Sequence, residues 1–194
     1  MLDLSSRAAS SDPLPADYTW LLPRHPREGW LSHANMGGHT RFWLSIHRSF
    51  RGAAAQLDAL NGGWREGAVE TETFLRETAP RLQHFLQALE HHHHMEDHVF
   101  FPRFTAAEPR VAKGIDLLET DHEAIDRAIH ETVTAANALL RAAHGRDADL
   151  RAPGEAFTTT ADALTALMRR HLDDEEEIVM PLILDRGEAA LGVE

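Results

Sequence analysis

The stretch from Leu86 to Pro102, LQALEHHHHMEDHVFFP, places a histidine and a glutamate where a packed helix normally carries aliphatic side chains. Residues that recur at alternating steps of three and four lie on one face of an α-helix. At that spacing, His92 and Glu96 interrupt an apolar series made of Leu82, Phe85, Leu89 and Val99. The pattern therefore puts two polar groups on the face expected to contact other helices.

A second stretch, between Ala161 and Pro181, repeats this arrangement. Its face is formed by Ala161, Leu164, Met168, His171, Glu175 and Ile178. In both stretches the glutamate follows the histidine by four positions, stands six positions before a proline, and is followed directly by a second acid, Asp97 or Glu176. The chain thus carries one His-x-x-x-Glu motif twice.

The composition limits the class of protein. A chain of 194 residues with 43% hydrophobic content is long enough for one well-buried core and short for two, so we expect a single globular domain. There is no cysteine, so any bound metal must be held by nitrogen and oxygen atoms. The fourteen histidines are the unusual feature of the composition.

The charge and the apolar runs argue against two kinds of partner. A net charge of -12 disfavours nucleic acid and anionic membrane surfaces, which attract clustered lysine and arginine. The first thirty residues lack a basic start followed by an apolar run, and no segment has the apolar length needed to cross a bilayer. We therefore expect a cytoplasmic protein with no nucleic-acid or membrane partner.

Apolar spacing divides the chain into three parts. Residues 1–33, rich in serine and proline, predict an irregular N-terminal strap, and residues 185–194 predict a short polar tail. Between them, residues 34–184 predict an all-α, antiparallel four-helix bundle. The four amphipathic helices are expected at about Ala34–Leu60, Val69–Phe101, Val111–Ala143 and Gly154–Leu184. Asn61-Gly62-Gly63 predicts the first helix stop, and Pro80 predicts a kink or a restart in the second helix.

His47 and His122 occupy apolar positions of the first and third helices in the same way. Six polar residues are thus expected in the core: His47, His92, Glu96, His122, His171 and Glu175. Glutamate is almost never fully buried without a partner. One interpretation is a network of His-Glu ion pairs that fills a polar core. The other is a metal site, because four nitrogens and two carboxylates suit a pair of iron or manganese ions.

This order of motifs resembles the hemerythrin-like family, the HHE cation-binding domain, over about Ala34–Leu184. The shared features are an early helical histidine, an HxxxE motif before Phe-Pro, a third-helix histidine and an HxxxE motif before a proline. The resemblance implies a hemerythrin-like bundle with a non-haem di-iron centre, an oxo or hydroxo bridge, and both glutamates spanning the two irons. Manganese or zinc are the alternative metals. Ferritin-like di-iron bundles use Glu-x-x-His, the opposite order.

The function implied by the resemblance is that of a di-iron oxidoreductase that binds and reacts with dioxygen, peroxide or nitric oxide. One alternative is a di-iron oxygenase or oxidase acting on a small organic molecule. Another is an iron or oxygen sensor that acts through a protein partner. The pattern assigns no catalytic residue beyond the metal ligands and leaves the substrate and the redox partner open.

One departure from the family pattern bears on this function. Asp126 stands where oxygen-carrying hemerythrins have a second third-helix histidine. As a ligand, Asp126 would add negative charge and favour the oxidised metal, which predicts redox chemistry and disfavours reversible oxygen carriage. As a solvated acid on the helix face, Asp126 would have no such effect.

Five further residues are candidates for extra ligands or for groups that support the ligands. Asp97 and Glu176 are expected to orient ligand histidines or to face solvent, with direct ligation as a third interpretation. His39 is an alternative ligand from the first helix. His91 and His93 flank His92, and because consecutive helix positions are about 100° apart, the neighbours of His92 are expected mainly on the flanks of the helix.

Overall fold

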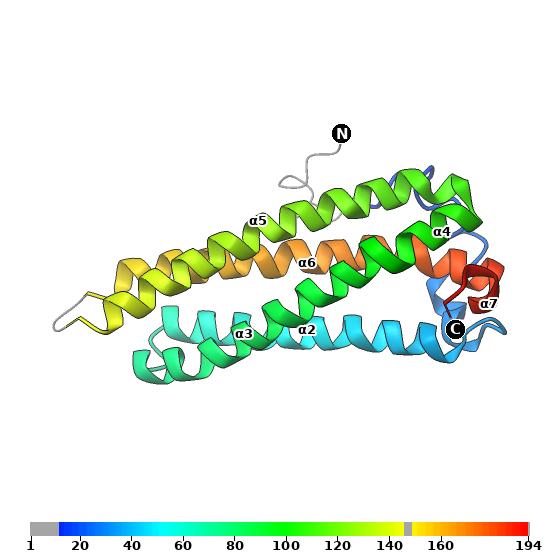
Figure 1. Ribbon diagram of the computed structural model, residues 1–194. Coiled ribbons are helices and arrows are strands. Elements are labelled where there is room, and N and C mark those ends of the chain that lie inside the picture. The colour runs from blue at the N-terminus through cyan, green and yellow to red at the C-terminus, as the bar shows by residue number, and fades with distance from the viewer. Residues whose placement is uncertain (1–11, 146–148, 194) are drawn as a thin grey trace.

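The computed structural model describes residues 12–145 and 149–193, and within these ranges the chain forms helices and no strand. Four long helices run along the molecule in Figure 1: α2 (Gly38–Arg65), α3 (Thr71–Met95), α5 (Ala112–Ala143) and α6 (Arg151–Arg186). Shorter elements are the 3-10 helices η1 (Arg27–Ser32) and η3 (Pro109–Val111), the π-helical turn η2 (Glu96–Phe100), α4 (Phe101–Ala107) and α7 (Glu188–Leu191). The predicted all-α bundle is confirmed.

The long helices pack as two neighbouring pairs. α5 lies along α6, α2 lies along α3, and the pairs meet where α2 contacts α6 and α3 contacts α5. Short connections join α2 to α3 and α5 to α6 at the same end of the bundle (Figure 1), so the helices of each pair are antiparallel. Each long helix therefore turns one face toward a shared interior.

That interior consists of two apolar clusters with a polar layer between them. On each helix, the predicted histidine has a residue of the first cluster on one side and a residue of the second on the other. The flanking residues are Phe50, Leu89, Ile125 and Met168 in the first cluster and Trp43, Leu118, Ile178 and Phe101, at the start of the α4 that continues α3, in the second. Because this order holds on all four helices, the polar residues form one layer across the bundle.

The first long helix continues past the predicted stop at Asn61-Gly62-Gly63 and ends at Arg65. Asn61 is buried, and its Nδ2 donates to Asp162 Oδ1 at 2.7 Å, so a contact with α6 holds this turn in the helix. The chain turns away at Gly67, whose φ of 74° is readily adopted only by glycine. The predicted stop was therefore placed too early.

The second helix also differs from the prediction. α3 runs through Pro80 without a restart and continues into η2, α4 and the turn that follows. A π-helical turn shifts the register of the side chains that come after it. Val99, expected on the buried face, is consequently half-buried, whereas Phe101 and Phe104 are fully buried in its place.

Both ends of the chain contribute to the core. In the predicted N-terminal strap, whose residues 1–11 lie outside the described ranges, Leu14 and Leu21 pack in the second apolar cluster. The expected polar tail contains α7, and Leu191 and Val193 are each 2% exposed and join the same cluster. The tail is therefore part of the packed domain. None of the described helices has both the length and the apolar character needed to cross a membrane.

Candidate metal centre

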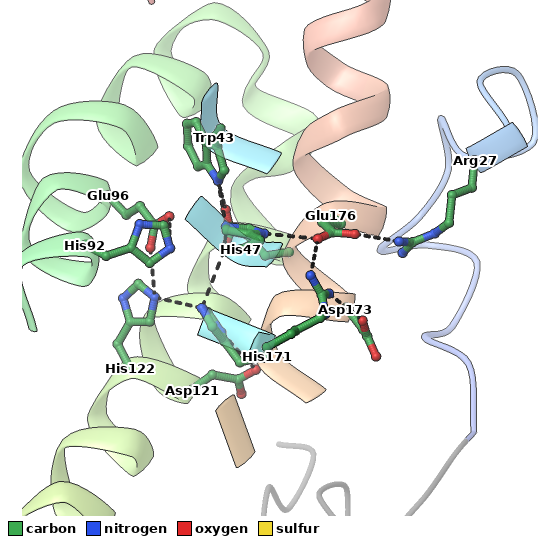
Figure 2. Close-up of polar contacts among 12 residues, drawn as sticks. Arg27, Trp43, His47, His92, Glu96, Asp121, His122, His171, Asp173 and Glu176 are labelled. Carbon is green, nitrogen blue, oxygen red and sulfur yellow. Dashed lines mark hydrogen bonds and ion pairs between the residues drawn. The ribbon is translucent and has the colours of Figure 1, made fainter. Parts of the chain in front are cut away.

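The polar layer contains all six residues that the two motifs and the two single histidines predict. Each side chain is at most 9% exposed: His47 from α2, His92 from α3, Glu96 from η2, His122 from α5, and His171 and Glu175 from α6. Figure 2 shows how the labelled members of this set point toward one another. The amphipathic spacing thus brings the ligand types to one level of the bundle.

The donor atoms form two overlapping groups. Each residue of a group offers one donor atom, and these atoms lie within 4.8 Å of one another. The first group is His47, His92, Glu96 and Glu175, and the second is His93, Glu96, His122 and His171. Glu96 belongs to both. Glu175 Oε2 lies 3.3 Å from His47 Nε2 and 3.6 Å from His171 Nε2, so this carboxylate also reaches both groups. The layer can therefore hold two neighbouring cations with two carboxylates between them.

His93 is the one member of these groups that the family motif does not contain. Helical spacing alone places His93 on the flank, yet its side chain is 7% exposed and its ring stacks on His122 with centroids 3.9 Å apart. The backbone N–H of Glu96 contacts the carbonyls of both His92 and His93 as α3 passes into the π-helical turn. The π-helical turn begins at Glu96, after both histidines, and the two consecutive rings face neighbouring parts of the layer, His92 toward His47 of α2 and His93 toward His122 of α5. Turns of this kind are frequent at functional sites.

Three of the histidines have a carboxylate oxygen near Nδ1, on the side away from the layer. These pairs are His47 with Glu176 Oε1 at 3.1 Å, His122 with Asp97 Oδ1 at 2.7 Å, and His171 with Asp121 Oδ2 at 3.7 Å. A proton on Nδ1 leaves Nε2 free to accept, and such carboxylates fix the orientation of metal-binding histidines. Asp97 and Glu176 thus lie where they can orient the rings of His122 and His47. Asp121, next to His122 in sequence, was not singled out from the motif.

Glu176 is held by three groups. Besides His47, it accepts from Arg51 Nη1 at 2.7 Å and from Arg27 Nη1 of the N-terminal strap at 2.5 Å. Burial alone would raise the pKa of Glu176, but the hydrogen bond from His47 and the charge and hydrogen bond of Arg51 lower it to about 2. This carboxylate is therefore ionised and is engaged outside the layer.

The layer holds groups that are close together but poorly satisfied. Burial, followed by the nearby Glu175 carboxylate, raises the pKa of Glu96 well above its ordinary value. Burial and the neighbouring histidines lower the pKa of His92 and of His93 well below theirs. Glu96 Oε1 lies 3.0 Å from His92 Nε2, yet neither atom is aligned for a hydrogen bond. Buried polar atoms normally have a partner, so a bound cation fits this unsatisfied donor set.

Besides Asp97 and Glu176, three of the sequence candidates lie outside both groups. His39 is half-buried and packs against Phe100 with ring centroids 5.3 Å apart, and His91 is exposed. The side chain of Asp126 is 67% exposed and lies 3.6 Å from His130 Nδ1. Of the two interpretations of Asp126, the structure favours the solvated acid, and a fifth histidine nitrogen comes from His93 instead.

Two hollows adjoin the layer and differ in chemistry. A cavity of about 490 Å³ opens between α2 and α3, with largely apolar walls and with His92 and Glu96 at one end. A groove of about 760 Å³ runs between α3 and α5, and its lining combines the donors His93 and His122 and three further histidines with the acids Glu90, Asp97, Glu119, Glu123 and Asp126. The layer is therefore bordered by an apolar cavity on one side of α3 and by an acidic groove on the other.

Comparison with known proteins identifies the family. The profile of the hemerythrin HHE cation-binding domain matches residues 39–183, which include every residue of the two donor groups. No curated protein and no solved structure matched the chain significantly. The match spans most of the chain and begins and ends within the bundle, and the buried histidine and glutamate donors are compatible with the binding of a cation. The chain therefore belongs to the hemerythrin HHE cation-binding family.

Proposed function

We propose that this protein holds two iron ions in the polar layer and reacts there with dioxygen, peroxide or nitric oxide. The observation that carries the proposal is the pair of donor groups that share Glu96 and are both reached by Glu175. A single-cation site would not need two sets of histidines on either side of the same carboxylates. Glu96 and Glu175 would therefore be the residues that hold both ions, since each is within reach of both donor groups.

The donor set also bears on the choice of metal. The two groups offer five imidazoles and two carboxylates and no thiolate, a combination suited to iron, manganese or zinc. Iron is the metal that the family resemblance implies. When bound, a pair of iron ions supplies the electrons that reduce dioxygen or peroxide, and it provides positions where nitric oxide can bind.

The surrounding residues fix the donors and exclude water. Trp43 Nε1 lies 2.8 Å from Glu175 Oε1 and donates to it, which holds that carboxylate in place. The apolar clusters on both sides of the layer keep bulk water away along the bundle axis. Low polarity around a buried centre strengthens every electrostatic contact within it.

The alternative of a polar core without metal fits the structure less well. A network of ion pairs would align its donors and acceptors, because unsatisfied buried polar atoms each cost about 1–3 kcal/mol. Here His92 Nε2, His93 Nε2, both oxygens of Glu96 and one oxygen of Glu175 make no hydrogen bond among the described residues. These unsatisfied nitrogen and oxygen atoms belong to the two donor groups, which favours bound cations over a metal-free polar core. The sensor alternative stays a prediction.

The first test is a metal analysis of the isolated and the iron-reconstituted protein. We expect about two iron ions per chain in the wild type and less than one in Glu96→Gln and Glu175→Gln, because both ions lose a shared anionic ligand. Asp97→Asn is the matched control: it removes a neighbouring carboxylate that contacts Nδ1 of His122 and belongs to neither donor group, so it should retain both ions with a changed absorption spectrum.

The proposal has two separable parts. A protein that holds no metal, and whose stability is the same before and after chelation, would contradict the di-iron centre and restore the polar core. For the reactivity, the reduced iron-loaded protein is mixed anaerobically with dioxygen, hydrogen peroxide or a nitric oxide donor. A visible spectrum that responds to none of them would contradict the second part.

A further inference from the structure

The cavity between α2 and α3 ends at the candidate metal centre and opens to solvent. His92 and Glu96 lie among its lining residues, and so does Phe42, whose side chain is 60% exposed. Phe42 therefore marks the outer end and the donor layer marks the inner end. A molecule bound in this cavity would lie beside two of the proposed ligands and could still exchange with solvent.

The walls of this cavity are mostly aromatic and aliphatic. Trp43 and Phe100 form one side, with ring centroids 4.9 Å apart, and Phe50 lies 5.1 Å from the His92 ring farther in. Ile46 also lines the cavity, whereas no lysine or arginine does so among the described residues. Offset and edge-to-face contacts make aromatic walls favourable partners for another ring.

The size of the cavity exceeds what a diatomic gas requires. Sites for small organic molecules occupy about 300–1,000 Å³, and the volume of about 490 Å³ lies within that range. Water in such a space would find few hydrogen-bond partners along the walls, so its replacement by an apolar molecule is favourable. The acidic groove between α3 and α5 offers the opposite chemistry and would disfavour such a ligand.

We propose that this cavity binds a small, neutral aromatic molecule, with one edge against His92 and Glu96 and its faces against the rings of Trp43 and Phe100. Neutrality follows from the walls, which among the described residues include histidines but no lysine or arginine to pair with an anionic ligand, and from the largely apolar surface, which disfavours a charged one. That the bound molecule is a substrate of the centre rests on the proposed function. The binding itself does not require the metal.

The test uses 2-naphthol as the probe and isothermal titration calorimetry of the full chain, both metal-free and iron-loaded. Ala88→Phe fills the cavity from α3, and Ser49→Trp fills it from α2, where Ser49 is exposed and a larger side chain is tolerated by the fold. The matched control is Ala55→Phe, an equally large change at an exposed position of α2 that does not line the cavity. Iron content is measured for every variant.

We expect saturable binding to the wild type and about tenfold or weaker binding to Ala88→Phe and Ser49→Trp, because the added rings occupy the ligand's space. Ala55→Phe should bind within about twofold of the wild type, and all variants should hold the same amount of iron. Absence of saturable binding, or unchanged binding in both filled variants, would overturn the inference while an iron-loaded centre stands. Saturable binding by a wild-type chain that fails to take up iron on reconstitution would instead keep the ligand site and overturn the proposed function.

Discussion

At the scale of single residues, the layer depends on which nitrogen each histidine turns inward. In His47 and His122, a carboxylate lies at Nδ1 and the other nitrogen faces the layer, so the tautomer that a metal requires is already favoured. Neutral imidazoles also suit a buried site, since burial lowers the pKa of His92, His93 and His171. The proposed ligand set thus combines buried, oriented histidines with the two carboxylates of Glu96 and Glu175.

The contribution of His93 can be tested against its neighbour His94, which is exposed and belongs to neither donor group. We expect His93→Gln to lower the affinity for the second metal ion by about 10- to 100-fold, because one of four donors in that group is lost. His94→Gln should bind both ions like the wild type. The measurement is a competition titration with a chromophoric chelator, using Co²⁺ as a spectroscopic probe. Equal affinities in the two variants would remove His93 from the ligand set.

Glu176 gives a prediction about acid stability. Its pKa in the folded protein, about 2, lies below the ordinary value of 4.5, so its contribution to stability is present above pH 4.5 and is lost as the pH falls toward 2. Glu176→Gln should therefore lower the unfolding free energy of the metal-free protein by roughly 1–3 kcal/mol at pH 7, and by less at pH 3.5. Urea unfolding at both pH values measures the difference.

The control for this experiment is Glu131→Gln, which changes an exposed glutamate of α5. Its effect should stay within about 0.5 kcal/mol at both pH values. A Glu176→Gln effect that is as large at pH 3.5 as at pH 7 would show that packing, and not the charge on the carboxylate, stabilises this contact.

At the scale of the elements, apolar spacing predicted the buried faces of the helices better than it predicted their ends. The buried face of α2, with Trp43, Phe50 and Leu57, follows directly from steps of three and four. The helix end could not be predicted in this way, because Asn61 is held by a residue of α6 that is about a hundred positions away in sequence. Contacts between distant segments override local stop signals.

The two glycines near that end provide a test. Gly62 has no heavy atom within 4 Å of the position of an added Cβ, whereas a Cβ on Gly63 would lie 2.7 Å from Val69 Cγ2. Gly62→Ala should raise the unfolding free energy by about 0.5–1 kcal/mol, as expected for glycine within a helix. Gly63→Ala should lose this gain and destabilise the protein by about 1–3 kcal/mol. Thermal unfolding of both variants measures these changes in stability. Equal gains in unfolding free energy would show that the Val69 side chain moves away from the added methyl group without cost.

The candidate site was predictable for a related reason, and only in part. His92, Glu96, His171 and Glu175 follow from their place in two apolar series, and the structure places all four in the layer. His93 could not be found by a periodicity of 3.6, because that periodicity places it beside the apolar series of α3, and its contact with His122 joins two helices. Asp121 was missed because its relation to His171 joins two helices and has no signature within either.

At the scale of the whole molecule, the N-terminal strap is connected to the metal layer through charge. Arg27 of η1 contacts Glu176, which in turn contacts His47 of the layer. Arg51 adds a second positive group to the same carboxylate. The negative charge behind His47 is thus compensated, whereas Asp97 behind His122 has an exposed side and no arginine among its described contacts.

This distribution of charge leads to a prediction on the response to oxygen. The proposed centre has two buried carboxylates, Glu96 and Glu175, and further carboxylates behind its histidines, so negative charge should stabilise the oxidised metal and lower its reduction potential. We expect the reduced iron-loaded protein to oxidise in air and to stay oxidised when oxygen is pumped away. The visible spectrum of the anaerobically reduced protein, recorded before, during and after exposure to oxygen, measures this.

Of the two aspartates Asp97 and Asp126, we expect Asp97 to have the larger effect on the reduction potential of the centre. Asp97→Asn removes a negative charge in contact with His122 and should raise the reduction potential by roughly 50 mV, which is close to a tenfold change in a one-electron equilibrium. Asp126→Asn, at a side chain that is 67% exposed, should shift it little because solvent screens that charge. Spectroscopic redox titration compares the two variants with the wild type. If Asp126→Asn gave the larger shift, the carboxylates behind the histidines would not set the reduction potential of this centre. If the wild type recovered its reduced spectrum completely on removal of oxygen, reversible oxygen binding would replace the oxidative function.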